Sequence, residues 1–173
     1  MGSLAPFTLK GFYLLTWGNA LGSNVWNTIS GFKAYSSVPK ETFSLLSSVQ
    51  QPLYLQTQVT LTTLLLGTHL NFHRSLLHTH KWWKHEEGVQ ALLVLGAWAP
   101  TLINALIVGP ACARAAIDRA GLEKVEGKDA SSPAASTELQ NANTRFQLYH
   151  GISSALNAVS LIALTTLGLA ISA

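Results

Sequence analysis

Histidines are the side chains in this sequence most able to carry out chemistry, and five of the six lie within residues 69–85. His69 and His73 are four residues apart, so they would share one face of a helix. Imidazole nitrogens at that spacing could bind zinc or haem, with His150 as a more distant candidate ligand. A structural zinc site needs four ligands and a catalytic one usually three, and no spacing in the sequence supplies the others.

The same segment is also rich in residues that are typical of a membrane surface. Trp82 and Trp83 are adjacent, and Arg74, Lys81 and Lys84 lie close to them. Tryptophan side chains gather at headgroup depth, where basic side chains also remain in contact with water. We therefore favour an interfacial collar over a metal or haem site, and we expect no bound cofactor.

Composition favours a membrane location for the chain over burial in a large assembly. Only 11% of the 173 residues are charged, whereas a typical soluble domain has about 25%. Mean hydropathy is +0.26, and the formal net charge is only +3. The basic residues are scattered and form no stripe of the kind that binds nucleic acid. The single cysteine, Cys112, rules out an intrachain disulfide.

Four apolar segments are long enough to cross a bilayer, which takes about 20 residues. They are residues 11–32, 53–72, 88–112 and 146–172. Every Lys, Arg, Asp and Glu lies outside them, as expected when a charge at a helix centre costs about 2.5–3.5 kcal/mol. The sequence therefore predicts an all-α fold, in which residues 1–173 form one integral membrane domain, a bundle of four transmembrane helices.

The connections between these spans differ in length and composition. Residues 36–52 predict either a plain loop or a short interfacial helix ended by Pro52. Residues 119–144 are polar and rich in small side chains, so we expect a flexible loop there. The first and third connections have seven Lys and Arg residues, against four on the other side, which favours placing these connections in the cytosol.

Polar residues recur within the spans at helical spacing and predict a polar interior for the bundle. The candidates are Asn19, Ser23 and Asn27 in the first span, Asn104 in the third, and His150, Ser153, Ser154 and Asn157 in the fourth. Two interpretations remain open: hydrogen bonds that hold the helices together, or a hydrated cavity that passes a substrate. No Asp or Glu lies within a span, which argues against a carboxylate proton relay. We expect His150 to face the bundle and to hydrogen-bond to another helix.

Gly18 and Gly22 form a GxxxG pattern in the first span. Two glycines at this spacing allow the backbones of neighbouring helices to approach closely. The sequence therefore predicts a helix-packing contact at these two residues.

Three stretches resemble the transmembrane protein 205 family. They are "WGNALGSNVWNTISGFKAYSSVPKETF" at residues 17–43, "INALIVGP" at residues 103–110 and "RFQLYHGISSALN" at residues 145–157. The resemblance implies a eukaryotic four-pass membrane protein with a long loop before its last span. It brings no established catalytic residues, and the histidine cluster is not part of the family pattern.

These observations favour a non-enzymatic membrane protein that acts as a structural or assembly subunit. Its expected partners are the lipid bilayer and other membrane proteins or further copies of itself, in a eukaryotic endomembrane or the plasma membrane. One alternative is a transporter or channel component that uses the polar interior. The other is a haem- or metal-binding membrane protein. No nucleophile–base pair or phosphate-binding loop indicates another class of enzyme.

Overall fold

A computed structural model describes residues 8–78 and 80–172, and it is all-α over these ranges. The long helices are α1 (Leu9–Ser37), α2 (Lys40–Phe72), α3 (Glu86–Ile103), α4 (Gly109–Glu126) and α5 (Thr137–Ser172). A π-helical turn, η4 (Asn104–Val108), joins α3 to α4, and two short 3-10 helices, η2 (Arg74–His78) and η3 (Trp82–Lys84), lie between α2 and α3. α3, η4 and α4 together form one helix of 41 residues, Glu86–Glu126.

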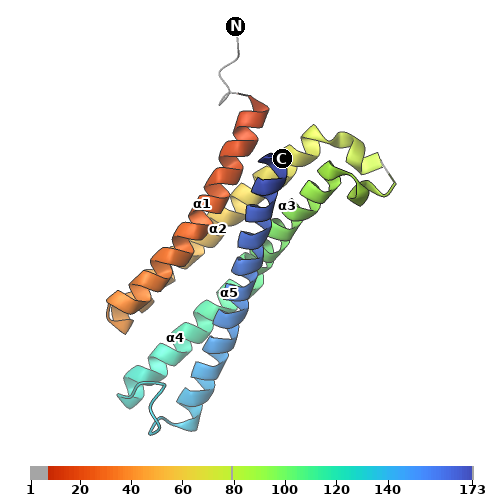
Figure 1. Ribbon diagram of the computed structural model, residues 1–173. Coiled ribbons are helices and arrows are strands. Elements are labelled where there is room, and N and C mark those ends of the chain that lie inside the picture. The colour runs from red at the N-terminus through yellow and green to blue at the C-terminus, as the bar shows by residue number, and fades with distance from the viewer. Residues whose placement is uncertain (1–7, 79, 173) are drawn as a thin grey trace.

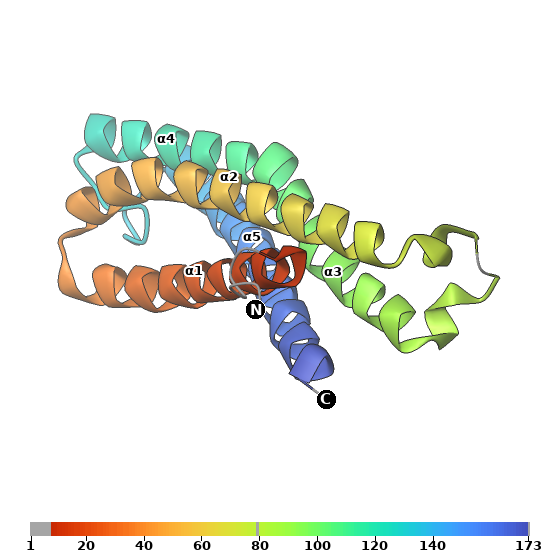
Figure 2. The same cartoon turned by 90° about the horizontal axis from the view of Figure 1, so that it is seen from above.

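The helices are arranged as two antiparallel hairpins (Figure 1). α1 packs on α2, and the long α3–α4 helix packs on α5, while α2 also contacts α3 and α1 contacts α5. The start of α1 and the end of α5 lie at the same end of the molecule. At the opposite end, α4 packs chiefly on the first half of α5, and their tip reaches beyond the α1–α2 turn in Figure 1. Figure 2 shows that α5 crosses the other helices at an angle.

Two helices in the described part of the chain are long and apolar enough to cross a membrane, Glu86–Glu126 and Thr137–Ser172. They contain the third and fourth predicted spans. The first two predicted spans lie within α1 and α2, which are more polar and do not meet the same criterion. The all-α prediction is confirmed by the helices that make up the described residues.

The connection at residues 36–52 is mostly helical, as one of the two alternatives had it, but Pro52 does not end that helix. Pro52 lies inside α2, and the helix continues through it with contacts to α1 on both sides: Phe43 packs on Tyr35, and Gln58 donates to Ala20.

The flexible loop predicted at residues 119–144 is also largely helical, so that prediction was wrong. α4 and α5 extend into the predicted loop at 119–144, leaving residues 127–136 as the connection. This connection is anchored by apolar contacts of Ala130, Ala135 and Leu139 with Leu122.

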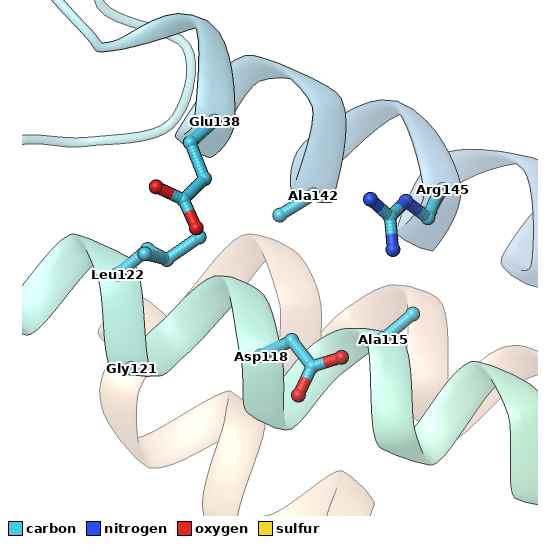
Figure 3. A pocket seen from close by; sticks show the side chains of 7 residues that line it. All are labelled: Ala115, Asp118, Gly121, Leu122, Glu138, Ala142 and Arg145. Carbon is cyan, nitrogen blue, oxygen red and sulfur yellow. The ribbon is translucent and has the colours of Figure 1, made fainter.

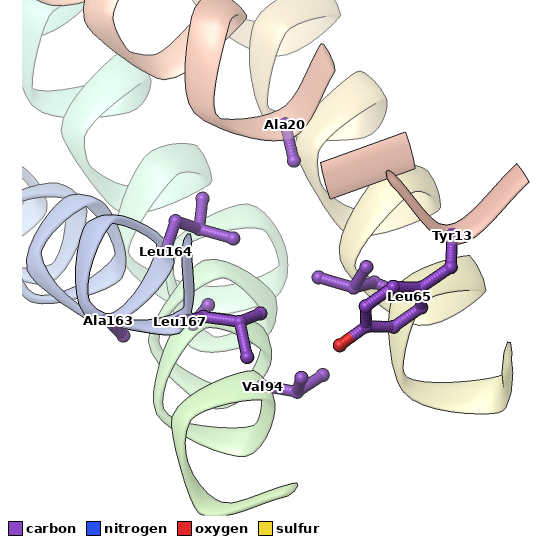
Figure 4. Packing of buried hydrophobic residues seen from close by; sticks show 8 residues of the cluster. Tyr13, Ala20, Leu65, Val94, Ala163, Leu164 and Leu167 are labelled. Atoms are coloured by element: carbon purple, nitrogen blue, oxygen red, sulfur yellow. The ribbon is translucent and has the colours of Figure 1, made fainter. Parts of the chain in front are cut away.

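The apolar core lies where α1, α2, α3 and α5 meet (Figure 4). Its buried members are Tyr13, Ala20, Leu65, Val94, Ala97, Ala163, Leu164 and Leu167. Trp17 packs against this core, and its indole Nε1 donates to the carbonyl oxygen of Leu164 at 2.8 Å. Gly168 makes this fit possible, because a Cβ atom there would lie 2.3 Å from the Trp17 ring.

The π-helical turn follows from the residues that end it. In a regular α-helix the ring of Pro110 would clash with the carbonyl group four residues earlier, and a widened turn relieves that clash. The N–H of Gly109 instead donates to the carbonyl oxygen of Asn104, five residues back. A Cβ atom at Gly109 would lie 2.8 Å from that oxygen and 2.9 Å from a Leu55 methyl group, so the position needs glycine.

Candidate functional site

A layer of polar side chains crosses the middle of the bundle, and its centre is a pair of asparagines. Nδ2 of Asn24 on α1 donates to Oδ1 of Asn157 on α5 at 3.2 Å, and Nδ2 of Asn157 donates back to Oδ1 of Asn24 at 3.2 Å. The hydroxyl of Tyr54 on α2 also donates to Oδ1 of Asn157. Asn24 is fully buried, so this cluster ties three helices together away from solvent.

Gln58 joins α2 to α1 one turn along from Tyr54. Its Nε2 donates to the carbonyl oxygen of Ala20 at 3.0 Å and to the hydroxyl oxygen of Ser23 at 2.7 Å. Gln58 is 1% exposed, and its side-chain oxygen has no hydrogen-bond partner among the described residues. The carbonyl oxygen of Ala20 can only accept, so the amide must present its NH₂ group to Ala20 and its oxygen elsewhere.

α3 and the π-helical turn contribute the rest of the layer. The hydroxyl groups of Thr101 and Ser160 lie 3.0 Å apart, and both residues are buried. Nδ2 of Asn104 donates to the carbonyl oxygen of Ser153 at 3.1 Å, which leaves Oδ1 of Asn104 buried without a partner among the described residues. The layer therefore combines closed interhelical pairs with amide oxygens that can still accept a hydrogen bond.

The model of a family described as a domain of unknown function (DUF4149) matches residues 15–120. The chain belongs to this family. No curated protein and no solved structure matches it. The DUF4149 match covers nearly all of α1 to α4, but it ends before α5. Asn157, Ser160 and Ser153 thus complete the polar layer from outside the segment that defines the family.

The structure brings together some of the predicted interior residues of this DUF4149 protein. Asn104 is buried, and Ser23, Ser153 and Asn157 are half-buried and make the contacts described above. Asn27 is half-buried, and its side-chain oxygen is buried without a described partner.

Three predicted interior residues lie outside the layer. Asn19 is exposed, and its amide donates to the carbonyl oxygen of Leu15 on its own helix at 2.8 Å. Ser154 is exposed on α5. His150 is exposed as well, and its ring stacks on Phe146 of the same helix with centroids 5.6 Å apart. The prediction that His150 hydrogen-bonds across the bundle was wrong, because α5 turns that face away from the other helices.

The predicted glycine contact does not form between the helices of this chain. Gly18 and Gly22 are exposed, and a Cβ atom at either would meet nothing within 4 Å. α1 instead buries the face that contains Tyr13, Ala20 and Asn24, which lies on the opposite side of the helix.

The histidine segment forms a polar cap at one end of the bundle. Nε2 of His69 lies 2.9 Å from the carbonyl oxygen of Glu87, which can only accept, so Nε2 carries the proton. Nδ1 then accepts from the hydroxyl of Tyr13 at 3.3 Å. Both ring nitrogens of this 1% exposed side chain are therefore engaged, and neither is free to bind a metal.

The second candidate ligand, His73, lies beside His69, which has no free ring nitrogen with which to share a metal ion. Their ring centroids are 4.8 Å apart with the planes tilted by 43°. A cavity of about 200 Å³ borders His73, His85 and Glu87. Nevertheless, over the described ranges no three His, Cys, Asp or Glu side chains are grouped so as to hold a metal ion.

Several members of the layer were missed by sequence reasoning. Asn24 is one residue from the predicted stripe, and Tyr54 and Gln58 lie just inside the second span. The sequence of α1 contains a stronger indication of the buried face, because Tyr13, Ala20 and Asn24 share one helix face, with Trp17 at its edge. Large side chains with one polar atom favour positions where that atom can reach a partner on another helix.

Proposed function

We propose that this chain is an integral membrane protein that crosses the bilayer four times and acts as a non-enzymatic structural or assembly subunit. Its resemblance to the transmembrane protein 205 family supports a eukaryotic endomembrane or the plasma membrane as its location. Membership of the DUF4149 family supplies no activity.

The outward faces of the helices support the membrane part of the proposal. Large apolar side chains are exposed along the spans, among them Trp26, Ile29, Phe32, Leu106, Ile162 and Leu169. Exposed hydroxyls in these faces donate to carbonyl oxygens four residues back on the same helix, as at Thr57, Thr60, Thr165 and Thr166. A hydroxyl bonded in this way can face lipid without an unsatisfied donor.

The observation that carries the structural role is the closed cluster of Asn24, Tyr54 and Asn157. Within the described residues, the hydrogen bonds of these three side chains all run between helices, and none of the three is a nucleophile paired with a base. Such pairs specify which helices pack together. They also leave the outward apolar faces free to contact other membrane proteins.

The test is depletion of the chain from its native membranes. Mild-detergent extracts should contain it in a complex larger than its 18.6 kDa mass, and its removal should lower the abundance of the other members. Re-expression should restore them, as should the exposed-site variant His150→Leu. A chain that is monomeric in such extracts, and whose loss changes no other protein, would contradict an assembly role.

The unpartnered amide oxygens favour a second candidate function, a transporter or channel component. Oε1 of Gln58 is a buried acceptor on α2, and Oδ1 of Asn104 is a buried acceptor in the π-helical turn itself. Distorted helices at membrane depth often border sites for polar solutes. Purified protein in sealed liposomes would distinguish the two functions. Ion or solute flux that is lost in Asn104→Leu, while His150→Leu retains it, would support transport over the structural role.

A further inference from the structure

The α4–α5 hairpin contains a groove that the proposed function does not use (Figure 3). Its volume is about 400 Å³. Small and apolar side chains form its floor, and three charged side chains, Asp118, Glu138 and Arg145, border it. Figure 3 shows Asp118 extending from α4, and Glu138 and Arg145 from α5, around the space between the two helices.

The three charged groups are not neutralised by one another. Within residues 8–78 and 80–172, no hydrogen bond or ion pair is found for Asp118, Glu138 or Arg145. The neighbouring Arg119 differs, because its guanidinium lies 4.2 Å from the centre of the Phe146 ring and 4.0 Å from Glu123. The groove therefore presents one free cation and two free carboxylates to whatever enters it.

These charges follow a fixed order along the hairpin. Arg145 immediately precedes the predicted span at 146–172, so it would lie at the level of lipid phosphates. Glu138 is in the first turn of α5, seven residues further out, which is a rise of about 10 Å. Asp118 lies between them on the facing helix α4. The positive group is thus nearest the bilayer, and the negative groups lie further into the water.

We propose that this groove binds the headgroup of a zwitterionic phospholipid of the phosphoethanolamine class. The phosphate accepts hydrogen bonds from Arg145, and the terminal ammonium donates to Asp118 and Glu138. In such a headgroup the phosphate is the deeper charge and the amine the outer one, which is the order that the groove provides. A primary amine fits better than a quaternary one, since only N–H groups can donate to carboxylates. The inference rests on the membrane placement in the proposed function.

The experiment uses the full chain, purified and delipidated in mild detergent. Phosphatidylethanolamine, phosphatidylcholine and phosphatidylglycerol with identical acyl chains are added separately, and bound lipid is counted by native mass spectrometry. We expect one tightly retained phosphatidylethanolamine and weaker retention of the other two lipids. Equal retention of all three, or strongest retention of phosphatidylglycerol, would overturn the proposal.

Substitutions in the groove locate the binding. Arg145→Gln and Glu138→Gln should each weaken phosphatidylethanolamine retention roughly tenfold or more, because each removes a charge-assisted hydrogen bond. Lys124→Gln, an exposed α4 charge outside the groove, is the matched control and should have no effect. Glu138→Lys should reverse the selectivity and favour phosphatidylglycerol. Unchanged lipid preference in all three groove variants would overturn the proposal.

Two further measurements make two distinctions. The first distinguishes a lipid from a soluble ligand, and the second distinguishes failure of the headgroup site from failure of the membrane placement. Soluble phosphoethanolamine should compete weakly with the lipid, and binding of the soluble compound alone would overturn a lipid ligand. Alkaline extraction of native membranes tests the placement itself. A chain that resists extraction but shows no lipid preference refutes only the headgroup site, whereas a chain released by alkali refutes the membrane placement as well.

Discussion

Single residues set the distances between these helices, and Gly168 is the clearest case. Its missing side chain admits the Trp17 ring, whose Nε1 then reaches the Leu164 carbonyl oxygen at 2.8 Å. The glycines of the GxxxG pattern border no other helix. A large side chain should therefore destabilise the fold at Gly168 and leave its stability unchanged at Gly18 or Gly22.

We predict that Gly168→Leu lowers stability and that Gly22→Leu does not. The new side chain at 168 must displace Trp17, and overpacking of this kind costs about 1–3 kcal/mol. The measurement is thermal unfolding in detergent, with Gly22→Leu as the matched control. Equal melting temperatures for the two variants would show that α1 and α5 do not meet at Trp17.

The asparagine pair allows a sharper prediction, because its two members depend on each other. Asn157→Leu leaves the amide of Asn24 buried without its partner, which costs about 1–3 kcal/mol. Asn24→Leu should cost a similar amount. The double variant should cost less than the sum of the two, since no amide then remains unpaired. Additive costs in a double-mutant cycle would mean that the two amides do not interact.

Sequence reasoning at this scale identified the residue types but not the rotation of each helix. The spacing of Asn19, Ser23 and Asn27 indicated a polar stripe on α1. The face that is buried includes Asn24 instead. The two faces differ by a rotation about the helix axis of less than one residue step, which is about 100°. The GxxxG pattern favoured the wrong face, because a small residue can serve either packing or exposure. Only the positions of the neighbouring helices decide between these uses.

At the scale of elements, one carboxylate holds the far end of the connection between α4 and α5, in addition to its apolar contacts. The hydroxyl and the backbone N–H of Ser136 both donate to Glu126 at the end of α4. Both hydrogen bonds lower the pKa of Glu126, and the one from the hydroxyl has the larger effect. Since they favour the ionised form, the carboxylate stabilises the connection only while it is charged.

We predict that residues 127–136 loosen as the pH falls below the ordinary pKa of a glutamate side chain, about 4.3. A pKa that is lowered in the folded state gives a stabilisation that is complete above the unfolded-state pKa. That stabilisation is lost as the pH falls through the folded-state value. Hydrogen exchange of the connection at neutral and acidic pH measures the effect. Glu126→Gln should exchange rapidly at both, and a pH response that persists in this variant would point to a different group.

The helices themselves were predictable from the absence of charge, but their ends were not. Charged residues mark where a span leaves the apolar phase, yet α4 continues for 14 residues past position 112 to Glu126. Small polar residues at 119–144 indicated a flexible loop, since their composition alone provides no core. The short-range contacts of Leu122 with Ala130, Ala135 and Leu139 depend on the turn and are not visible in composition.

The whole molecule has two ends of different character. One carries the His69 cap together with the start of α1 and the end of α5, and the other carries the α4–α5 tip. Seven of the eleven Lys and Arg residues belong to the side of that tip. Because basic residues favour the cytosolic side, the whole-molecule charge distribution predicts an orientation.

We expect a protease site inserted at residues 130–131 to be cut by protease added to the cytosolic face of sealed vesicles. A site placed at residues 79–80 should be protected until detergent is added. The fragments are identified by mass. The reverse pattern would show that the protein has the opposite orientation, while cleavage at both sites would exclude a four-span arrangement.

The π-helical turn inserts one extra residue into the long helix, so that the side chains of α4 are rotated about the helix axis relative to those of α3. Deleting Ala105 would restore an unbroken α-helical phase and rotate α4 by about 100° relative to α3. In a Cys112→Ala background, a cysteine at the buried Ala115 should resist thiol reagents, whereas one at the 71% exposed Ile117 should react. The deletion should abolish that contrast. A one-residue change in chain length would then determine which side of α4 meets α5, and hence whether the headgroup groove exists at all.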